Sequence, residues 1–323
     1  MHAIVQQKVQ RTAQQKTLQH IRVAFAFFLG TSLFVANAWG EWAALESKVV
    51  LADDGHPLTV WIKRAPQATQ SILLVHGRTW SARPDFDLMV KGEDLSLMDG
   101  LVARGFNTYA IDLRGYGSTP RDKSQWLTPD QAADDVATVL AWIHTEDHPQ
   151  QKPHLFGWSM GSTVAQLAVQ RHTGIAQSLS LFGYWRDADM ILPTDSPDLS
   201  LQRSVNTATA AASDFITPGS ISPQAIDAYV AAALSSDPVR VDVRNVDQYN
   251  ALDASTLTLP TLVIYGEHDP LAPTENQAKL YARIASGHKQ LVSVPGGDHA
   301  AFLESPRAYF INALVAFLDS TAQ

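Results

Sequence analysis

The segment HLFGWSMG, residues 154–161, places Ser159 between two glycines directly after a short apolar run. The run His154–Phe156 predicts a buried strand, and the apolar spacing over Thr163–Gln170 predicts a helix. A G-x-S-x-G sequence between a strand and a helix is typical of a sharp turn that lifts a serine hydroxyl above the edge of a sheet. The same pattern also occurs in ordinary glycine-rich turns, so the motif alone is a weak signal. Its position between a strand and a helix favours Ser159 as a nucleophile.

Strand-like and helix-like runs alternate on both sides of this segment. The other expected core strands are Ser71–His76, Asn107–Ile111, Ser178–Phe182, Thr261–Tyr265 and Gln290–Val294. The other expected helices lie near Leu95–Arg104, after Thr128, at Glu275–Arg283 and at Ala308–Leu318. This alternation predicts parallel β-α-β units and a sheet covered by helices on both faces. An Asp-Gly turn at Gly55 predicts an antiparallel hairpin that precedes these units.

The helix after Thr128 has a clear start signal. Thr128 can cap its first turn, Pro129 suits the first helical position, and Gln131 follows three residues after the threonine. This arrangement predicts a capping box, in which the two side chains satisfy free backbone N–H groups at the helix start.

The alternation breaks between residues 184 and 255, a segment rich in Ala, Ser, Asp and Pro with a helical pattern over Pro223–Leu234. A structureless loop of this length inside a compact domain is improbable. We therefore expect an inserted helical cap at residues 184–255. The core is expected to comprise residues 39–183 and 256–323.

Composition and charge restrict the possible functions. The chain has 323 residues, of which 46% are hydrophobic and 17% charged, which is the composition of a globular protein. The formal net charge is −8, which argues against nucleic acid and anionic membrane surfaces as partners. There is no cysteine, so disulfides, thiolate metal sites and cysteine nucleophiles are excluded.

The first 38 residues have the three parts of a secretory signal. Lys8, Arg11, Lys16 and Arg22 occur without any acidic residue, an uncharged apolar run covers residues 23–35, and an A-x-A site ends at Ala38. We expect export to the periplasm or the medium with cleavage after Ala38. The alternative is a retained N-terminal anchor at residues 23–35. That run is shorter than the about 20 apolar residues that a spanning helix needs.

A serine nucleophile needs a base, and the sequence offers candidates in two late loops. His299 follows the last expected strand, and Asp269 follows the strand before it. Both therefore fall at the carboxyl edge of the sheet, where open α/β sheets bind ligands. Asp187 and Asp189, which follow the strand Ser178–Phe182, are the alternative acids.

Four motifs together resemble the α/β-hydrolase superfamily, in its branch with an inserted cap. They are GWSMG (157–161), DLRGYGS (112–118), YGEHDP (265–270) and GGDHAAFLESP (296–306), in an order that matches the family. The resemblance covers roughly residues 49–318 apart from the cap. It implies an α/β-hydrolase fold with Ser159 as nucleophile, Asp269 as acid and His299 as base. Serine at the nucleophile position disfavours the dehalogenases and epoxide hydrolases of the family, which use aspartate.

The backbone N–H groups of Met160 and Arg78 are the expected oxyanion donors. In this fold one donor follows the nucleophile, and the other comes from the loop after an earlier strand, here His76-Gly77-Arg78. Arg78 departs from the family, because many relatives carry an apolar residue there. Its side chain could pair with an acidic group of the substrate or with a carboxylate of the cap.

These residues predict a serine hydrolase that cleaves an ester of a small molecule through an acyl-enzyme. We expect no cofactor and no metal. The alternatives are an aminopeptidase-like peptidase or amidase that uses the same triad, and a non-catalytic binding protein with this fold. Four aromatic side chains are expected to line the substrate pocket, although core packing is the default for each: Trp80, Trp158, Tyr184 and Trp185.

Overall fold

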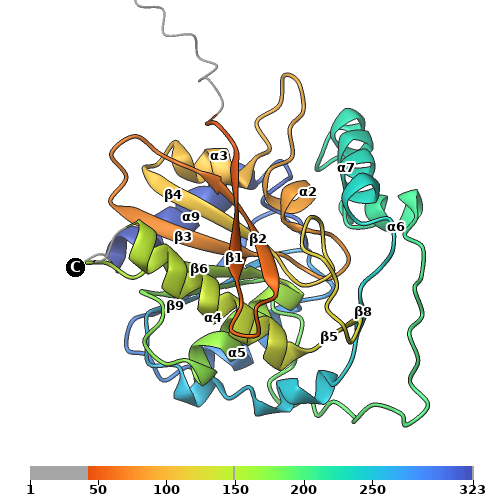
Figure 1. Cartoon of the computed structure of the whole chain (residues 1–323). Coiled ribbons are helices and arrows are strands. Elements are labelled where there is room, and N and C mark those ends of the chain that lie inside the picture. The colour runs from red at the N-terminus through yellow and green to blue at the C-terminus, as the bar shows by residue number, and fades with distance from the viewer. Residues whose placement is uncertain (1–42, 148–149, 322–323) are drawn as a thin grey trace, which may run out of the picture. The chain divides into compact units, whose positions relative to one another are not determined.

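An eight-stranded, mostly parallel β-sheet forms the centre of the computed structural model, which describes residues 43–147 and 150–321 (Figure 1). The strands lie in the order β1-β2-β4-β3-β6-β7-β9-β10. β2 pairs antiparallel with β1 and β4, and every other pair is parallel. The bounds are β1 Glu46–Leu51, β2 Pro57–Lys63, β3 Gln70–Val75, β4 Phe106–Asp112, β6 His154–Trp158, β7 Leu179–Phe182, β9 Thr261–Gly266 and β10 Lys289–Val294. The expected hairpin and parallel strands are thus confirmed.

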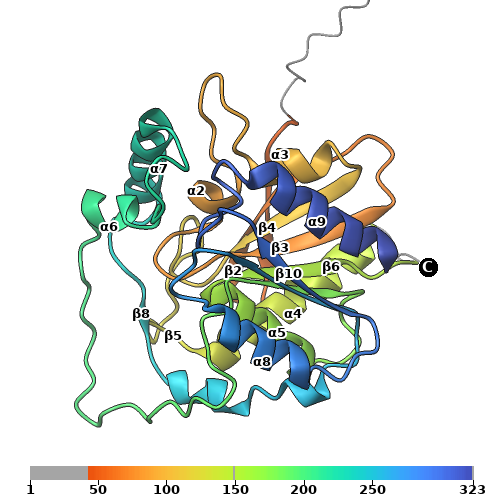
Figure 2. The ribbon, with the colours of Figure 1, turned by 180° about the vertical axis from the view of Figure 1, so that it is seen from behind.

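Helices cover both faces of the sheet because the strands are apolar on both faces. Successive strand residues point to opposite sides. In β3, for example, Leu73 and Val75 belong to one core cluster, and Ile72 and Leu74 belong to the other. The first cluster is covered by α4 (Pro129–Glu146), α5 (Met160–Arg171) and α8 (Thr274–Arg283). The second is covered by α2 (Ala82–Phe86), α3 (Leu97–Val102) and α9 (Arg307–Ser320), as Figure 2 shows from behind.

The start of α4 matches half of the expected capping box. The Thr128 hydroxyl accepts a hydrogen bond from the Gln131 N–H at 3.3 Å, and Pro129 occupies the first helical position. The Gln131 side chain, however, donates to Asp122 Oδ2 at 2.8 Å and does not return to the threonine. The nearby carboxylate provides a charged acceptor, which forms a stronger hydrogen bond than a neutral one.

The chain between β7 and β9 is helical only in its later part. Residues 183–207 contain no helix or strand apart from a single bridge between Val205 and Val239, and they appear as a long extended segment in Figure 1. Pro193 and Pro197 fall in this part, and proline removes the N–H that regular structure needs. The regular elements that follow are α6 Ala208–Ala212, α7 Pro223–Ser236, β8 Asp242–Val243, and the 3₁₀ turns η1 Val246–Ala251 and η2 Ala254–Thr256.

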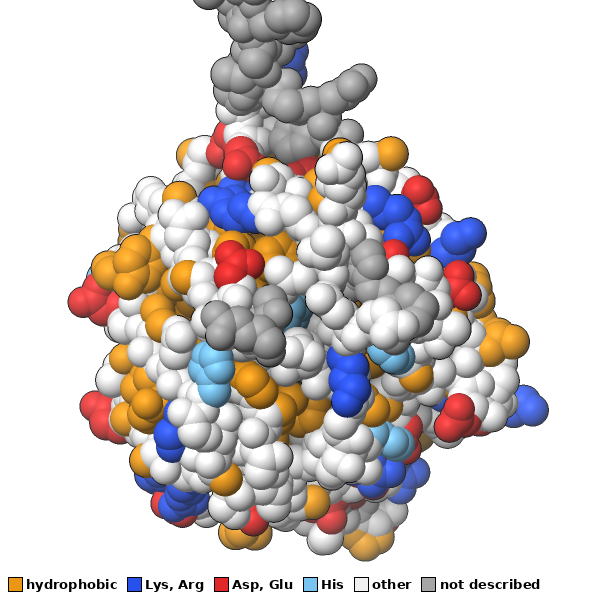
Figure 3. Space-filling view, turned by 90° about the vertical axis from the view of Figure 1, so that its left-hand side faces the viewer, with side chains coloured by type: hydrophobic (Ala, Val, Ile, Leu, Met, Phe, Trp, Pro, Cys, Tyr) orange, Lys and Arg blue, Asp and Glu red, His pale blue; other side chains and the backbone are white. Residues whose placement is uncertain are grey.

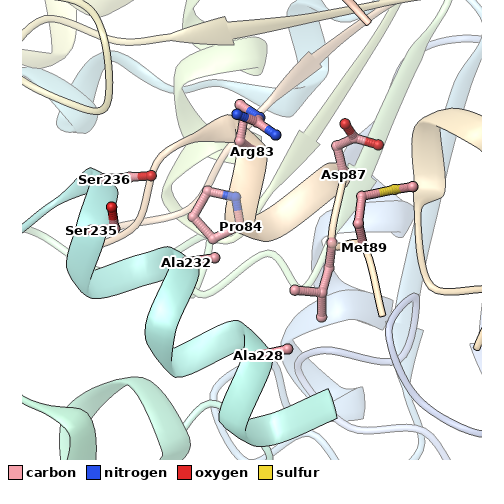
Figure 4. A pocket seen from close by; sticks show the side chains of 9 residues that line it. Arg83, Pro84, Asp87, Met89, Ala228, Ala232, Ser235 and Ser236 are labelled. Carbon is pink, nitrogen blue, oxygen red and sulfur yellow. The ribbon is translucent and has the colours of Figure 1, made fainter. Parts of the chain in front are cut away.

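Several contacts join this segment to the core. β8 pairs in parallel with the short strand β5 (Trp126–Leu127), and the Tyr229 hydroxyl of α7 donates to Asp85 of α2 at 2.9 Å. A cavity of about 280 Å³ lies between α2 and α7, as Figure 4 shows. It is lined by side chains of both helices and of the loop after α2, among them Arg83, Asp87 and Ser235.

The side of the molecule away from α6 and α7 has a mixed surface. In Figure 3, acidic and basic side chains are interspersed on this side, and hydrophobic side chains form small separate patches. No helix within residues 43–147 and 150–321 is both long enough and apolar enough to cross a bilayer. The signal or anchor expected at residues 1–38 lies outside the described residues.

Candidate active site

Ser159 lies in a strained turn between β6 and α5. Its φ of 54° and ψ of −119° fall in a region that non-glycine residues rarely adopt. The Ser159 N–H donates to the Phe182 carbonyl of the neighbouring strand β7 at 2.9 Å, which fixes the turn to the sheet. The flanking residues Trp158 and Met160 are buried, whereas Ser159 is partly exposed. The turn therefore presents the serine at the carboxyl edge of the sheet.

The glycines on each side of Ser159 are required by close backbone contacts. A Cβ atom at Gly157 would collide with the carbonyl of Gly161, and a Cβ atom at Gly161 would collide with the carbonyl of Val75. The turn can therefore form only because both positions lack a side chain. These backbone contacts explain why the G-x-S-x-G pattern has glycine at both positions.

His299 and Asp269 form a buried hydrogen-bonded pair. His299 Nδ1 lies 2.7 Å from Asp269 Oδ2, and the side chains are 6% and 0% exposed. The other oxygen, Asp269 Oδ1, accepts from the N–H groups of Leu271 and Ala272 at 2.9 and 3.2 Å. With the carboxylate held in this way, the ring proton of His299 is placed on Nδ1. Nε2 is then free to accept a proton.

Trp158 and Gly183 bring this pair to the serine turn. Trp158, which precedes Ser159, donates from Nε1 to the His299 carbonyl at 2.7 Å. Gly183, at the end of β7, has a φ of 58°, and a Cβ atom there would lie 3.0 Å from the His299 ring. Among the described residues, no hydrogen bond links the Ser159 hydroxyl to His299. Catalytic hydrogen bonds of this kind often tighten only when substrate is bound.

Asp187 and Asp189, the alternative acids, are engaged elsewhere. Lys279 of α8 binds Asp187 at 2.8 Å and Asp189 at 3.0 Å, and Arg283 also pairs with Asp189. The structure thus places Asp269 against His299, while the two alternatives pair with cations of α8.

The loop after β3 runs beside the serine. A Cβ atom at Gly77 would lie 3.3 Å from the Ser159 Cβ. Within the part of the chain that the structure describes, the N–H groups of Arg78 and Met160 have no hydrogen-bond acceptor. Thr79, the next residue, has a φ of 100°, which is strained for a β-branched side chain. Two unpaired N–H groups therefore flank Ser159.

His76 has a structural role in this loop. Its Nε2 accepts from the Leu113 N–H at 3.1 Å, so Nδ1 carries the proton and donates to the Gly77 carbonyl at 2.8 Å. Burial lowers the pKa of His76 to about 4, so the ring is neutral at physiological pH. The neutral ring holds the loop in place beside Ser159.

A family model matches residues 66–306, and its description is "Serine aminopeptidase, S33". The match covers well over half of the chain. The chain belongs to this family of α/β-hydrolases.

Curated relatives of the chain include an esterase and a lipase. It is 27% identical over 238 residues to the pimeloyl-[acyl-carrier protein] methyl ester esterase of Aeromonas salmonicida, which covers 64% of this chain and 84% of the relative. It is 25% identical over 235 residues to the monoacylglycerol lipase of Mycolicibacterium smegmatis, covering 68% of this chain and 80% of that one. Both of these relatives are named for ester or lipid hydrolysis.

Solved structures share the fold. A thermophilic esterase from Thermogutta terrifontis aligns with a TM-score of 0.61 at 20% identity, covering 86% of this chain and 100% of that one. An esterase from a Rhodococcus species aligns with a TM-score of 0.59 at 19% identity, covering 85% and 99%. The expected α/β-hydrolase fold is confirmed.

The role of Asp298 in this S33-family chain was not apparent from the sequence. Asp298 is fully buried, and its Oδ2 accepts from the N–H groups of Ile216 and Thr217 at 3.1 and 2.6 Å. Its Oδ1 accepts from the Ala300 N–H at 3.1 Å. Asp298 therefore connects the loop that carries His299 to the segment between α6 and α7. Its adjacency to His299 was the only sequence signal.

Glu304 reinforces the same connection. One carboxyl oxygen accepts from the Ser220 hydroxyl at 2.7 Å, and the other accepts from the Asp298 N–H at 3.3 Å. Burial, and then the neighbouring Asp298 charge, raise the pKa of Glu304 to about 7, although the Ser220 hydrogen bond opposes this shift.

A second buried acidic cluster lies where α7 meets α2. The Tyr229 hydroxyl lies 2.9 Å from Asp85 Oδ1 and 3.1 Å from Asp214 Oδ2. Burial raises the pKa of Asp214 to about 6, and the Tyr229 hydrogen bond and the nearby His299 counteract it. A phenol has one proton, so it can donate to only one of the two groups. The other carboxyl group must then be protonated and donate to the phenol oxygen.

Three of the four aromatic residues expected at the pocket are buried. Trp80, Trp158 and Tyr184 are 2%, 3% and 1% exposed. Trp185 is partly exposed, and its Nε1 lies 3.3 Å from the Thr163 hydroxyl. None of the four lines the cavity between α2 and α7 or a second cavity of about 440 Å³ beside Glu304. Their contact with substrate stays a prediction.

The Arg78 side chain is exposed and forms no ion pair within the described residues. Of the two roles considered from the sequence, pairing with a cap carboxylate is therefore not seen. Within the same residues, there is no cluster of three or more side chains suited to hold a metal ion.

Proposed function

We propose that the protein is a serine hydrolase that cleaves a carboxylic ester through an acyl-enzyme on Ser159. The observation that carries the proposal is the strained Ser159 turn, with the His299–Asp269 pair at the same edge of the sheet. The esterase and lipase relatives support an ester over other substrates. The proposed roles are nucleophile for Ser159, general base for His299 and orienting acid for Asp269.

In the first half of the reaction, Ser159 Oγ attacks the ester carbonyl while His299 Nε2 takes its proton. The carbonyl oxygen becomes negative and is bound by the N–H groups of Met160 and Arg78. Removing one preorganised hydrogen-bond donor of such an oxyanion typically lowers kcat by about 100- to 1000-fold. Asp269 Oδ2 stabilises the imidazolium that forms. The imidazolium then protonates the leaving alcohol as the carbon–oxygen bond breaks.

In the second half, water replaces the alcohol. His299 removes a proton from the water, which attacks the acyl carbonyl and forms a second oxyanion at the same N–H groups. The proton returns from His299 to Ser159 Oγ as the acyl bond breaks and the acid leaves. The hydrolase family implies a small-molecule substrate. Apart from that substrate and water, the mechanism uses only the chain's own residues.

The test is active-site labelling combined with turnover. A fluorophosphonate should label the wild-type protein at Ser159, and Ser159→Ala should abolish both labelling and hydrolysis of p-nitrophenyl esters. Its thermal midpoint should stay close to wild type, because only one partly exposed oxygen is removed. If purified Ser159→Ala retains most of the activity, Ser159 is not the nucleophile. A protein that neither reacts with the label nor turns over esters would be a binding protein.

An aminopeptidase-like activity is the second candidate, because the matching family is described as a serine aminopeptidase. The same triad can cleave an amide if it protonates the leaving amine. A panel that pairs p-nitrophenyl esters with aminoacyl p-nitroanilides separates the two candidates. Higher kcat/KM for the anilides would make the peptidase the better description.

We also propose that the protein is exported, with cleavage after Ala38. The basic segment before an uncharged run and the A-x-A site support this. N-terminal sequencing of the mature protein is the measurement. A product that still begins at Met1 in the membrane fraction would favour the anchor, and one in the cytosol would refute export.

A further inference from the structure

We propose that Arg78 and Arg240 form a cationic subsite beside Ser159 that binds a carboxylate of the substrate, so that the preferred ester is anionic. The inference rests on the proposed ester hydrolysis and specifies its substrate class. It is carried by the position of the two arginines and by the absence of carboxylates paired with them.

Arg78 is fixed beside the nucleophile by its neighbour in the loop. Gly77 packs so closely on Ser159 that an added Cβ atom would lie 3.3 Å from the Ser159 Cβ. The Arg78 side chain therefore begins one residue away from the point where the ester would react.

Arg240 reaches the same loop from the segment after α7. Its Nη2 donates to the Thr79 hydroxyl at 3.0 Å, so its guanidinium lies next to the residue after Arg78. Both charges also act on one buried phenol. Burial raises the pKa of Tyr116 to about 12, the charges of Arg78 and Arg240 counteract that shift, and the charge of Asp237 adds to it. Arg240 thus contacts the loop that carries Arg78, and both charges lie near the Tyr116 hydroxyl.

Neither guanidinium is in direct contact with a carboxylate within residues 43–147 and 150–321, although the charge of Arg240 also acts on the buried Asp214. Both side chains are exposed, and neither forms an ion pair with Asp or Glu. Other arginines of the chain are paired, as Arg171 is with Asp130 and Asp134. Acidic residues outnumber basic ones 32 to 24 in the whole chain. Arg78 and Arg240 are thus two exposed cations on one loop region that lack a directly bound carboxylate.

The chemistry of guanidinium identifies the ligand class. Its planar, fixed N–H groups match a carboxylate in two parallel hydrogen bonds, and the charge is permanent. A carboxylate a few bonds away from the reacting ester would neutralise the pair and orient the substrate at the same time. An uncharged substrate would leave both cations without a partner.

The test compares esters that differ only in this charge. Mono-p-nitrophenyl glutarate and p-nitrophenyl valerate have acyl chains of equal length, ending in a carboxylate and a methyl group. A third ester, 3-carboxy-4-nitrophenyl valerate, carries the carboxylate on the leaving group. We expect the wild-type kcat/KM to be higher for at least one anionic ester than for p-nitrophenyl valerate. The preference should fall as salt is raised, because ions screen exposed charges.

Arg78→Gln and Arg240→Gln should each lower the anionic-to-neutral ratio of kcat/KM by about tenfold, the worth of one charged hydrogen bond. Arg78→Lys, which keeps the charge, should restore part of the ratio. Arg171→Gln is the matched control, because it removes one arginine charge at the far end of the helix that begins after Ser159. It should leave the ratio unchanged. A ratio that is the same in wild type, Arg78→Gln and Arg240→Gln would overturn the proposal.

A binding measurement separates this inference from the proposed function. Calorimetry of glutarate with wild type and Arg78→Gln needs no turnover. If no ester is hydrolysed, ester hydrolysis is refuted, and the subsite is judged by glutarate alone. Binding that Arg78→Gln weakens about tenfold supports the subsite, and the absence of binding in wild type refutes it.

Discussion

One carboxylate oxygen, Asp269 Oδ2, decides which nitrogen of His299 carries the ring proton. It accepts from Nδ1, while its partner oxygen is occupied by two backbone N–H groups. Three donors hold the two oxygens of Asp269, so rotation of the carboxylate would break these hydrogen bonds. Its contribution to catalysis should therefore be orientation, and it should be lost when the carboxylate is replaced by an amide.

We expect Asp269→Asn to lower kcat by about 10⁴-fold, the effect of the same change in a serine protease triad. The amide would allow the wrong imidazole tautomer while preserving the shape of the side chain. Steady-state kinetics with one activated ester provides the measurement, and the thermal midpoint shows whether the fold is intact. Asp187→Asn and Asp189→Asn are matched controls, because their carboxylates pair with Lys279. If kcat stays near normal in Asp269→Asn but falls strongly in one of the controls, the residue changed in that control is the acid.

Individual site residues could be predicted from the sequence where their roles follow from the order of the motifs along the chain. Ser159, Asp269 and His299 each end or follow an apolar run, so their common sheet edge could be predicted. Gly183 could not be singled out in that way. Its closeness to the His299 ring depends on how β7 and the His299 loop fold together, and one glycine after a strand is an ordinary strand end.

At the scale of elements, the connection between the His299 loop and the segment before α7 depends on Asp298. Its Oδ2 receives the N–H groups of Ile216 and Thr217, which are more than 80 residues away along the chain. We expect Asp298→Ala to lower the unfolding free energy by about 1–3 kcal/mol, because the N–H groups of Ile216, Thr217 and Ala300 lose the carboxyl group that accepts from them. It should also lower kcat, since the loop beside His299 loosens.

Urea unfolding and kcat measured well below the melting temperature test this expectation. Asp319→Ala is a suitable control. It removes the same kind of side chain, but Asp319 is exposed on α9. Unchanged stability and unchanged kcat in Asp298→Ala would show that Asp298 is not needed as a connection.

Helices and strands could be predicted where apolar residues recur with a clear helical or strand spacing. Core strands and the helices that cover them follow from alternation, and Thr128 caps α4 as expected. The capping box was only half right, because Asp122 captures Gln131, and that contact depends on the path of a loop. Residues 183–207 show the opposite limit: they contain no helix and only one bridge, whereas the sequence indicates an inserted helical cap over 184–255 without separating this first part from the later helical part.

At the scale of the whole molecule, Glu304 should make stability depend on pH. Its pKa rises from an ordinary 4.5 to about 7 in the folded protein, mainly through burial. The folded state then holds a proton that the unfolded state releases. The stabilisation is fully present below pH 4.5 and is lost as pH rises through about 7. The titration of Glu304 should therefore lower the wild-type melting temperature as the pH rises from 4.5 to about 7.

Glu304→Gln removes this contribution and keeps an oxygen acceptor for Ser220. We expect the fall in melting temperature between pH 5 and pH 8 to be smaller in Glu304→Gln than in wild type. Buried acids away from Glu304, such as Asp214, titrate equally in both proteins, so the difference reports on Glu304 together with Asp298, which contacts it. Parallel melting curves with a constant offset over this range would contradict the prediction.

The two glycines around Ser159 also limit which mutations can compensate for one another. An added Cβ at Gly157 or Gly161 meets main-chain atoms, which no substitution elsewhere can remove. At Gly100, by contrast, the nearest atoms belong to the side chains of Ile311 and Arg307, which substitution can shorten. Second-site suppressors should therefore be accessible for Gly100→Ala and inaccessible for Gly157→Ala. A change at either glycine therefore cannot be compensated by shortening a neighbouring side chain.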